Sequence, residues 1–518
     1  MSHTTDQQMG LLSQLIDEKP PPAPATARNN NAIRTFSIKN VLSGIWSVLK
    51  PECFEKRAPG TGSGKRPGPT AWLDGLRGVA AFCVCIMHLS VFTHQGLELC
   101  YGAAYFWQTF NTSPAAWPIL RLPFTGGHFM VILFFTISGY VVPRSLISLL
   151  HQGRRDDFIE ALNAAMVRRM GRLFIPVWIS TLMLAFFWHI TGIATAFPEH
   201  QSNIFWELWA WWKDQMKFTY FFRGGFLFTY YNVHTWTIPV ELRGSLSLFV
   251  WLFCTHQVGT RSRILLTFAM TLYWVIGAAG AWYGAFFAGM LTAELDLLSA
   301  NGLHVPLPWD PIFRFFKRRR VLKVILMHLL LVSGLWLASQ PSSDTQDMQE
   351  VLGKCGAWGT LMKFIPDSYK EGNTTYRWFW LFWAAWFILV SVKEIPWVRW
   401  LFETGPAQYL GRHSFSLYLV HGPMIGLLSD RLFYLTGVKI PSNDDDIKRF
   451  GHLQNKWKDA SWWFLPEGGP YAMEPNYLFC VAMSLPVMLY VAEVVTRTCD
   501  IPGIKISRWY YAKMKSLR

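Results

Sequence analysis

Charged residues are scarce in this chain of 518 residues. Asp, Glu, Lys and Arg make up only 16% of it, hydrophobic residues make up 51%, and the mean hydropathy is +0.19. A soluble enzyme of this length exposes more polar surface, so the apolar residues must face lipid. Nucleic-acid binding is also excluded, despite a net charge of +15, because Lys and Arg lie between apolar stretches and form no single basic face interleaved with aromatics.

Several patterns of soluble enzymes are absent. The chain has no GxSxG elbow, no Walker A loop and no HExxH helix. Its eight cysteines form no CxxC pair and have no metal-ligand spacing, so the sequence predicts neither a metal site nor a disulfide scaffold. Cys100 and Cys355 are the most interesting pair, and we expect two free thiols there. No apolar stretch near the N-terminus indicates a cleavable signal peptide.

Composition divides the chain into three parts. Residues 1–70 are rich in Pro, Gly and charge, which predicts a disordered cytosolic tail. Residues 71–498 form one transmembrane domain, and residues 499–518 form a basic cytosolic tail. About ten apolar stretches approach membrane-crossing length, which predicts an all-α, polytopic transmembrane helix bundle. They are residues 78–97, 126–150, 173–195, 236–256, 263–280, 281–298, 321–339, 376–393, 407–435 and 477–497.

The charges between these stretches predict the orientation of the bundle. With a cytosolic N-terminus, the basic clusters of alternate loops and of the C-terminal tail all fall in the cytosol. The two Asn-x-Ser/Thr sequons, at Asn111 and Asn373, fall on the opposite side, where glycosylation takes place in a secretory compartment. We therefore expect a glycosylated, multi-pass protein of the endoplasmic reticulum, another endomembrane or the plasma membrane.

Arg77 and His88 lie on the first apolar stretch, eleven positions apart. This spacing is close to three helical turns and about 16 Å of rise, so both side chains share one helix face. Arg77 would lie at the cytosolic mouth and His88 near the middle of the membrane. An ionisable residue at that depth indicates function by default. The alternative is a structural histidine that is hydrogen-bonded to a neighbouring helix.

The fourth stretch carries a carboxylate and a guanidinium, Glu241 and Arg243, two positions apart. They cannot face each other on one helix, so each needs a partner elsewhere in the bundle or a water-filled cavity. His234 lies seven residues before Glu241 and nearly on its face. A catalytic group and an interhelical ion pair without catalytic duty are equally good interpretations of Glu241.

A basic cluster, Arg168, Arg169 and Arg172, precedes the third stretch. Such a cluster is typical of an anchor to anionic lipid. Its guanidinium groups also suit bidentate contacts to phosphate, so a phosphorylated ligand such as CoA would fit there. Charge alone does not distinguish a lipid anchor from a phosphate-binding site.

Five motifs in order resemble those of the acyltransferase-3 family of membrane-bound O-acyltransferases, from about Trp72 to Val495. The motifs are Trp72-Leu-Asp74-Gly75-Leu-Arg77-Gly78 with His88; Phe134-Phe-Thr-Ile-Ser138-Gly139-Tyr140; Arg168-Arg169-x-x-Arg172; Trp236-Thr-Ile-Pro-Val-Glu241; and Leu410-Gly411-Arg-His-Ser414-Phe-Ser416-Leu-Tyr418-Leu419-Val-His421. After Glu241 the chain departs from bacterial members, which commonly have a second acidic residue and aromatics there. Long Trp-rich loops and the basic tail look like a fungal branch.

The resemblance implies an O-acyltransferase that moves an acyl group, expected to be acetyl, from acyl-CoA to a hydroxyl of a small molecule, lipid or carbohydrate. His88 would act as the general base, and Glu241 would orient a histidine or position the acceptor. The CoA phosphates would be held by Arg77, Arg168, Arg169 and Arg172, with Ser138 and His421 as further substrate contacts. Acyl-CoA is a co-substrate here, and no bound cofactor or metal is implied.

Other functions are compatible with some of these residues. A transporter or proton-coupled permease also places His, Arg and Glu inside the membrane, but the order of the motifs and the lack of an internal duplication disfavour it. A catalytically inactive lipid-binding or signalling protein is disfavoured by the retention of Arg77 and His88. A covalent acyl-histidine that relays the acyl group across the membrane is a variant of the same reaction.

Overall fold

The structure is a computed structural model of the chain. It describes residues 46–54, 68–103, 112–193, 195–223, 225, 227–342, 352–353, 355–370, 375–439, 463 and 465–517. In these residues the regular structure is helical and no β-strand forms, which confirms the predicted all-α class. The sequons at Asn111 and Asn373 lie outside the described residues, and so does most of the tail 1–70.

Each of the predicted apolar stretches coincides with a helix or a run of helices. The longer helices are α3 (Ala71–Thr93), α5 (Gly127–Val141), α6 (Arg144–His151), α7 (Arg155–Thr191), α8 (Ile204–Thr219), α9 (Thr237–Thr255), α10 (Thr260–Leu272), α11 (Ala281–Ala300), α12 (Asp310–Arg318), α13 (Arg320–Ala338), α16 (Arg377–Glu394), α17 (Pro396–Glu403), α18 (Gly405–Met424), α21 (Pro475–Val495) and α22 (Ile501–Ser516). Short helices and single turns complete the described fold: α4 (Leu122–Thr125), α15 (Ala357–Leu361), α19 (Asp430–Leu435), η1 (Glu52–Phe54), η2 (Gln95–Glu98), η3 (Pro114–Ala116), η4 (Val233–Trp236), η5 (Tyr273–Gly277), η6 (Met362–Phe364), η7 (Asp367–Tyr369), η8 (Ile425–Ser429) and η9 (Thr496–Asp500).

Fewer helices than the predicted ten could each cross a membrane by length and composition. Within the described residues there are six, or up to seven if α16 and α17, which meet at a bend of 94°, form one span. Other predicted stretches are shorter or more polar than a lipid-facing helix: α10 has 13 residues, and α11 carries Glu294 and Asp296. Protein surrounds much of α11, so its polar groups need not face lipid.

Helices α3 and α18 form the most extensive helix pair of the described fold. Glycine permits the close approach: a Cβ atom added at Gly78 of α3 would lie 2.2 Å from the backbone nitrogen of Gly411 on α18. A Cβ added at Gly411 would lie 2.5 Å from the carbonyl oxygen of Asp74. Any larger residue at either position would push the helices apart. Both glycines belong to the motifs that the sequence singles out, and the pair forms one wall of the site described below.

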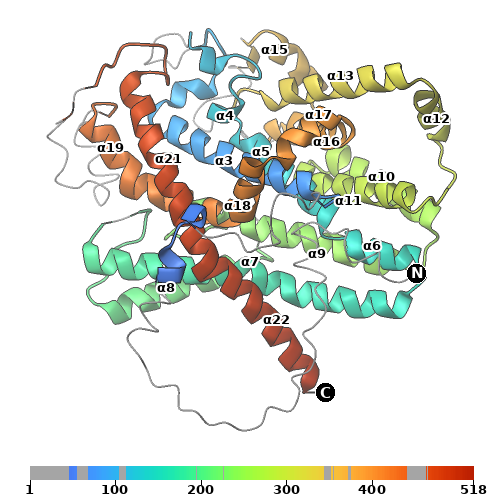
Figure 1. Cartoon of the computed structure of the whole chain (residues 1–518), viewed down its shortest axis with the longest axis horizontal. Helices are drawn as coiled ribbons and strands as arrows, with labels where there is room; N and C mark the ends of the chain where they lie inside the picture. Colours follow the sequence, from blue (N-terminus) through green and yellow to red (C-terminus); the bar gives the residue numbers. More distant parts are fainter. Residues whose placement is uncertain are drawn as a thin grey trace.

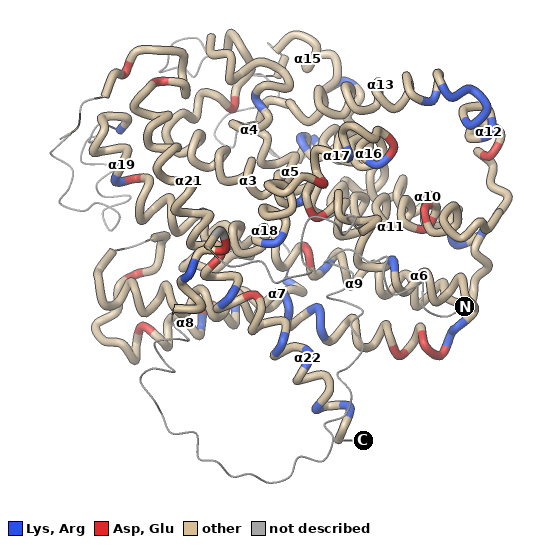
Figure 2. The backbone as a smooth tube through the Cα atoms, viewed as in Figure 1, with Lys and Arg blue, Asp and Glu red and all other residues tan. Residues whose placement is uncertain are grey.

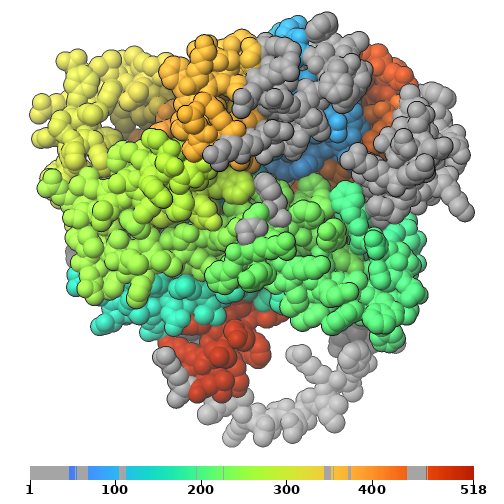
Figure 3. Space-filling model, turned by 180° about the vertical axis from the view of Figure 1, so that it is seen from behind, coloured from blue at the N-terminus to red at the C-terminus, as the bar shows by residue number. Residues whose placement is uncertain are grey.

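The C-terminal helices α21 and α22 follow one another as a long rod that crosses the bundle (Figure 1). Most of α21 carries no charged residue, whereas Lys and Arg recur along α22 (Figure 2). Seen from behind, the end of the rod projects from the bundle (Figure 3). The predicted basic tail, residues 499–518, is therefore largely helical, and α22 packs against α7.

Cys100 and Cys355 form a disulfide, so the prediction of two free thiols is wrong. The two residues are 255 positions apart in the sequence, yet their Cα atoms lie 5.9 Å apart. Spacing along the chain could not reveal this pair, because the fold alone brings the segment after η2 to the segment before α15.

Candidate active site

A cavity of about 220 Å³ lies inside the bundle, between α3, α5, α7, α9 and α18. Apolar side chains such as Val84, Phe134 and Phe135 form much of its wall. Its polar side chains fall into two groups. The histidine end contains His88, His128, His234 and His421, and the arginine end contains Arg77, Arg169, Arg172 and Arg412 together with Glu241 and Asp500.

The α3–α18 pair sets the distance between the two ends. Nη2 of Arg77 donates a hydrogen bond of 2.8 Å to the carbonyl oxygen of Gly411, which ties the helices together at the arginine end. Eleven positions further along α3 lies His88, and ten positions further along α18 lies His421; their ring centroids are 5.0 Å apart. At 1.5 Å of rise per residue, the two ends are roughly 15 Å apart.

Three imidazole rings meet at the histidine end. The ring centroid of His234, from η4, lies 4.4 Å from that of His88 and 4.7 Å from that of His421. Three separate segments therefore converge on one point of the cavity wall. Imidazole is the side chain best suited to accept and return a proton near neutral pH, so this cluster can perform general acid–base chemistry.

The position of the proton on His421 follows from its hydrogen bond. Nδ1 lies 2.7 Å from the carbonyl oxygen of Tyr418, and because a carbonyl oxygen only accepts, Nδ1 carries a proton, which leaves the lone pair of the neutral ring on Nε2. Nε2 is buried, and within the described part of the chain it has no hydrogen-bond partner. The neutral His421 ring therefore presents a lone pair on Nε2 beside the other two rings.

The segment that carries His234 is tied to α18 at several points. The Asn232 side chain donates 2.8 Å to the carbonyl oxygen of Leu419, and the Tyr418 hydroxyl donates to the carbonyl oxygen of His234. Gly422 leaves room for the ring, since a Cβ atom there would lie 2.1 Å from Nδ1 of His234. The absence of a side chain at Gly422 is therefore required for the three-histidine arrangement.

His128 adds a fourth histidine to this end. Its Nε2 lies 2.5 Å from Nη1 of Arg377, and its Nδ1 lies 3.3 Å from the Ser342 hydroxyl. Because a guanidinium only donates, Nε2 of His128 accepts and the ring is neutral. Arg377 is almost completely buried, so it holds a positive charge behind the wall of the histidine end.

The arginine end contains an interhelical ion pair between Glu241 of α9 and Arg169 of α7. The Ser138 hydroxyl also hydrogen bonds with the Glu241 carboxylate, and Nε of Arg169 donates 3.1 Å to the Ser245 hydroxyl. Glu241 therefore forms an interhelical ion pair, whereas its catalytic role stays a prediction. No histidine is among the partners that the structure describes for it. The reason is position: Glu241 lies seven residues beyond His234, on the arginine side of the cavity.

The predicted basic cluster is divided between two spaces. Arg77, Arg169 and Arg172 line the main cavity and act on one another electrostatically. Arg168 instead lines a smaller adjoining hollow of about 50 Å³, which it shares with Arg169, Arg172 and Arg508 of α22. Arginines therefore outnumber the carboxylates of Glu241 and Asp500 in the cavity and the hollow, so anionic groups would meet an excess of positive charge there.

Among the His, Arg, Asp and Glu residues that line the cavity, four were not predicted as site residues: His128, His234, Arg412 and Asp500. Arg412 stands inside the late motif, and His234 stands two residues before Trp236, so the motifs themselves held the signal for these two. His128 and Asp500 belong to none of the motifs, and only the fold brings them to the cavity.

The three histidines could also hold a metal ion. One ring nitrogen from each of His88, His234 and His421 lies within 4.8 Å of the others. Neutral imidazole is a good ligand for Zn²⁺ and similar ions, and three such ligands with an open position are typical of catalytic zinc sites. The absence of a bound metal stays a prediction of the sequence, and elemental analysis of the purified protein tests it.

Comparison with known proteins agrees with the motif pattern. The profile of the acyltransferase domain, acyltransferase-3, matches residues 70–489. The chain is 27% identical to the O-acetyltransferase PaAT-1 of Phomopsis amygdali over 490 residues, which cover 86% of this chain and 85% of that protein. It is 24% identical to the acyltransferase R4 of a Phoma species, with 74% and 88% covered, and 25% identical to the acyltransferase clz18 of Cochliobolus lunatus, with 68% and 82% covered. No solved structure matches it. Because the family profile spans most of the described helices, the chain belongs to the acyltransferase-3 family and is an acyltransferase.

Proposed function

We propose that the protein transfers an acetyl group from acetyl-CoA to a hydroxyl group of an acceptor molecule inside the membrane. The observation that carries the proposal is one cavity with a histidine cluster at one end and an arginine cluster at the other. A CoA thioester has the matching polarity, since its anionic phosphates are separated from a neutral thioester by a long, flexible arm. The relative from Phomopsis amygdali is named an O-acetyltransferase, which favours acetyl as the transferred group.

The arginine end would hold the phosphates. Arg77, Arg169 and Arg172 can donate charge-assisted hydrogen bonds, and Arg168 and Arg508 extend this surface into the adjoining hollow. With the phosphates fixed there, the arm would follow the apolar wall and bring the thioester toward the histidines. Holding the donor in this way converts the reaction into an effectively unimolecular step.

At the histidine end, His88 would act as the general base. The acceptor hydroxyl attacks the thioester carbonyl carbon while His88 takes its proton, and a tetrahedral intermediate forms. The carbon–sulfur bond then breaks, the thiolate of CoA leaves, and the imidazolium returns the proton to it. The products are the O-acetyl ester and CoA-SH, so atoms and charge balance. His234 and His421 touch the His88 ring and would keep it in place.

The acceptor would bind against the apolar part of the wall. Val84, Met87 and Trp236 face the same cavity as the histidines, so the part of the acceptor near the reacting hydroxyl is expected to be apolar. A small lipophilic molecule or a lipid fits this surface better than a carbohydrate, which would leave its hydroxyl groups without partners.

The test combines binding with product analysis. Purified protein in detergent is titrated with labelled acetyl-CoA, and metabolites of cells with and without the gene are compared by mass spectrometry. Binding of acetyl-CoA and a set of metabolites heavier by one acetyl group support the proposal. Should the protein fail to bind acetyl-CoA while it carries a solute across the membrane of liposomes, the acyl-transfer proposal is wrong.

A further inference from the structure

A short segment before α3 lies against the arginine end of the bundle. Residues 46–54, here called the N-terminal strap, belong to the tail that composition predicts to be disordered, yet they have defined contacts with α21 and η9. Nη1 of Arg497 donates 2.9 Å to the carbonyl oxygen of Val48 and 2.5 Å to that of Lys50. The Tyr490 hydroxyl donates 2.8 Å to the carbonyl oxygen of Leu49. The strap is therefore anchored by its backbone, independently of its own side chains.

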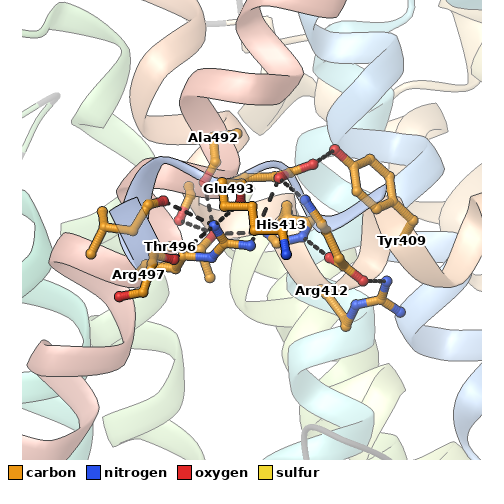
Figure 4. Close-up of polar contacts among 12 residues, drawn as sticks. Tyr409, Arg412, His413, Ala492, Glu493, Thr496 and Arg497 are labelled. Carbon is orange, nitrogen blue, oxygen red and sulfur yellow. Dashed lines mark hydrogen bonds and ion pairs between the residues drawn. The ribbon is translucent and has the colours of Figure 1, made fainter. Parts of the chain in front are cut away.

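The strap places a carboxylate beside α18. One carboxylate oxygen of Glu52 binds Nη2 of Arg412, the other lies 2.9 Å from Nε2 of His413, and the backbone N–H of Glu52 donates 2.8 Å to Glu493. Figure 4 shows the Arg412, His413 and Glu493 side chains of this network, and Glu493 also accepts a hydrogen bond of 2.5 Å from the Tyr409 hydroxyl. Burial raises the pKa of Glu52, but its hydrogen bond from His413 and the charge of Arg412 outweigh burial and hold that pKa below its ordinary value.

Arg412 belongs to both the strap contact and the cavity. It lines the arginine end, next to the Gly411 carbonyl that binds Arg77. A guanidinium has five donors, so the one that binds Glu52 leaves others for a second anion. The guanidinium of Arg412 therefore lies between the strap and the space that we propose for the CoA phosphates.

A phosphate could readily replace Glu52 as the partner of Arg412. The side chain of Arg412 is 39% exposed and that of Glu52 is 32% exposed, so water and salt screen their attraction. Exposed ion pairs of this kind contribute little, whereas a phosphate offers an arginine more negative charge and more acceptor oxygens. A carboxylate left next to an incoming phosphate would in addition repel it.

We infer that Arg412 is a further phosphate contact of the donor site and that Glu52 is an internal competitor, which occupies Arg412 until acyl-CoA binds. This inference rests on the proposed function. The strap thereby adjusts the affinity for the donor without entering the cavity, and only the Glu52 side chain has to move when the donor arrives.

The test measures the Kd of labelled acetyl-CoA for full-length protein and variants in detergent. We expect Glu52→Gln to lower the Kd about two- to fivefold, which is the range for removal of an exposed ion pair. Arg412→Gln should raise the Kd at least about tenfold, and Arg412→Lys should recover part of the loss. In an Arg412→Gln background, Glu52→Gln should have no further effect, because the pair no longer exists.

A matched control distinguishes the loss of the Glu52–Arg412 pair from a general change in the charge of the protein. Glu160→Gln removes one carboxylate from an exposed pair between α7 and Lys515 of α22, and we expect it to leave the Kd unchanged. Adenosine 3′,5′-bisphosphate, a fragment of CoA without the thioester, should follow the same pattern as a competitor. If parent protein binds acetyl-CoA but Glu52→Gln does not bind it more tightly, or Arg412→Gln binds it equally well, the inference is wrong and the proposed function stands. A parent protein that does not bind acetyl-CoA overturns both.

Discussion

The two ends of the cavity hold their polar groups in different ways. At the histidine end the rings of His421 and His234 are positioned by a backbone carbonyl oxygen and by close packing, as in the Tyr418 contact of His421 and the space left by Gly422 for His234. At the arginine end the guanidinium groups face carboxylates, as in the pairs of Arg169 with Glu241 and Arg412 with Glu52. We therefore expect the histidine end to be sensitive to changes of side-chain size and the arginine end to changes of charge. Each kind of substitution should affect only its own end of the cavity.

The largest effect is expected from His88→Ala. Loss of a positioned general base should reduce the rate of acyl transfer by about 10²- to 10⁴-fold, while the affinity for acetyl-CoA stays within a few-fold of the parent. His304→Ala, at an exposed position outside the cavity, is the matched control and should leave the rate unchanged. An acyl-transfer rate of His88→Ala within a few-fold of the parent would remove the general-base role.

Gly422→Ala tests shape at the same end. The added methyl group would occupy the place of the His234 ring, so that ring must move, and a displacement of about 1 Å can reduce a rate by about 10²-fold. Acetyl-CoA binding should not change. Gly259→Ala is the control, because a Cβ there meets nothing within 4 Å. If the Gly422→Ala protein transfers acyl groups normally, the three-ring arrangement is not needed for the reaction.

Charge at the arginine end is tested by Arg77→Gln and Arg168→Gln. Each should weaken acetyl-CoA binding by roughly 1.5 to 3 kcal/mol, about 10- to 150-fold, through lost charge-assisted hydrogen bonds. Lys replacements should recover only part, since a point charge cannot reproduce the bidentate fork. Arg154→Gln removes an exposed arginine paired with Asp157 and serves as the control. If all these variants bind acetyl-CoA as tightly as the parent protein, the basic cluster determines only the orientation of the protein in the membrane.

The smallest effect is expected from salt. Phosphate contacts near water are screened, so the Kd of acetyl-CoA should rise a few-fold as ionic strength increases from about 0.01 to 0.15 M, because the Debye length falls from about 30 to 8 Å. The rate of transfer from bound acetyl-CoA, measured in a single turnover, should not depend on salt. A salt-dependent single-turnover rate would mean that charge acts at the histidine end as well.

The sequence predicts the helices and part of the site because both follow local rules. Apolar stretches of sufficient length must become helices in a membrane, and the eleven-residue spacing of Arg77 and His88 brings both to one cavity. The motifs also indicate which stretches carry polar groups. Local rules do not say which helices become neighbours, so the α3–α18 pair and the placement of His128 come only from the fold.

The partners of charged residues cannot be predicted from this sequence. The sequence predicts that Glu241 needs a partner elsewhere in the bundle, but it does not name Arg169, because the packing of α7 beside α9 is not determined by periodicity. The ion pair of Arg412 is likewise not predictable from the sequence, because its partner Glu52 lies 360 positions away. Composition indicates disorder for the tail, but it cannot show that a few residues of that tail meet a complementary surface.

The Cys100–Cys355 disulfide indicates which side of the bundle faces an oxidising compartment. It lies just beyond the end of α3 that follows His88, on the side of the bundle opposite to Arg77. Disulfides persist in oxidising compartments and are rare in the reducing cytosol, so that side is expected to face a lumen or the cell exterior. In the proposed reaction, acetyl-CoA would then enter from the reducing side, and the redox difference across the membrane would coincide with the direction from donor to acceptor.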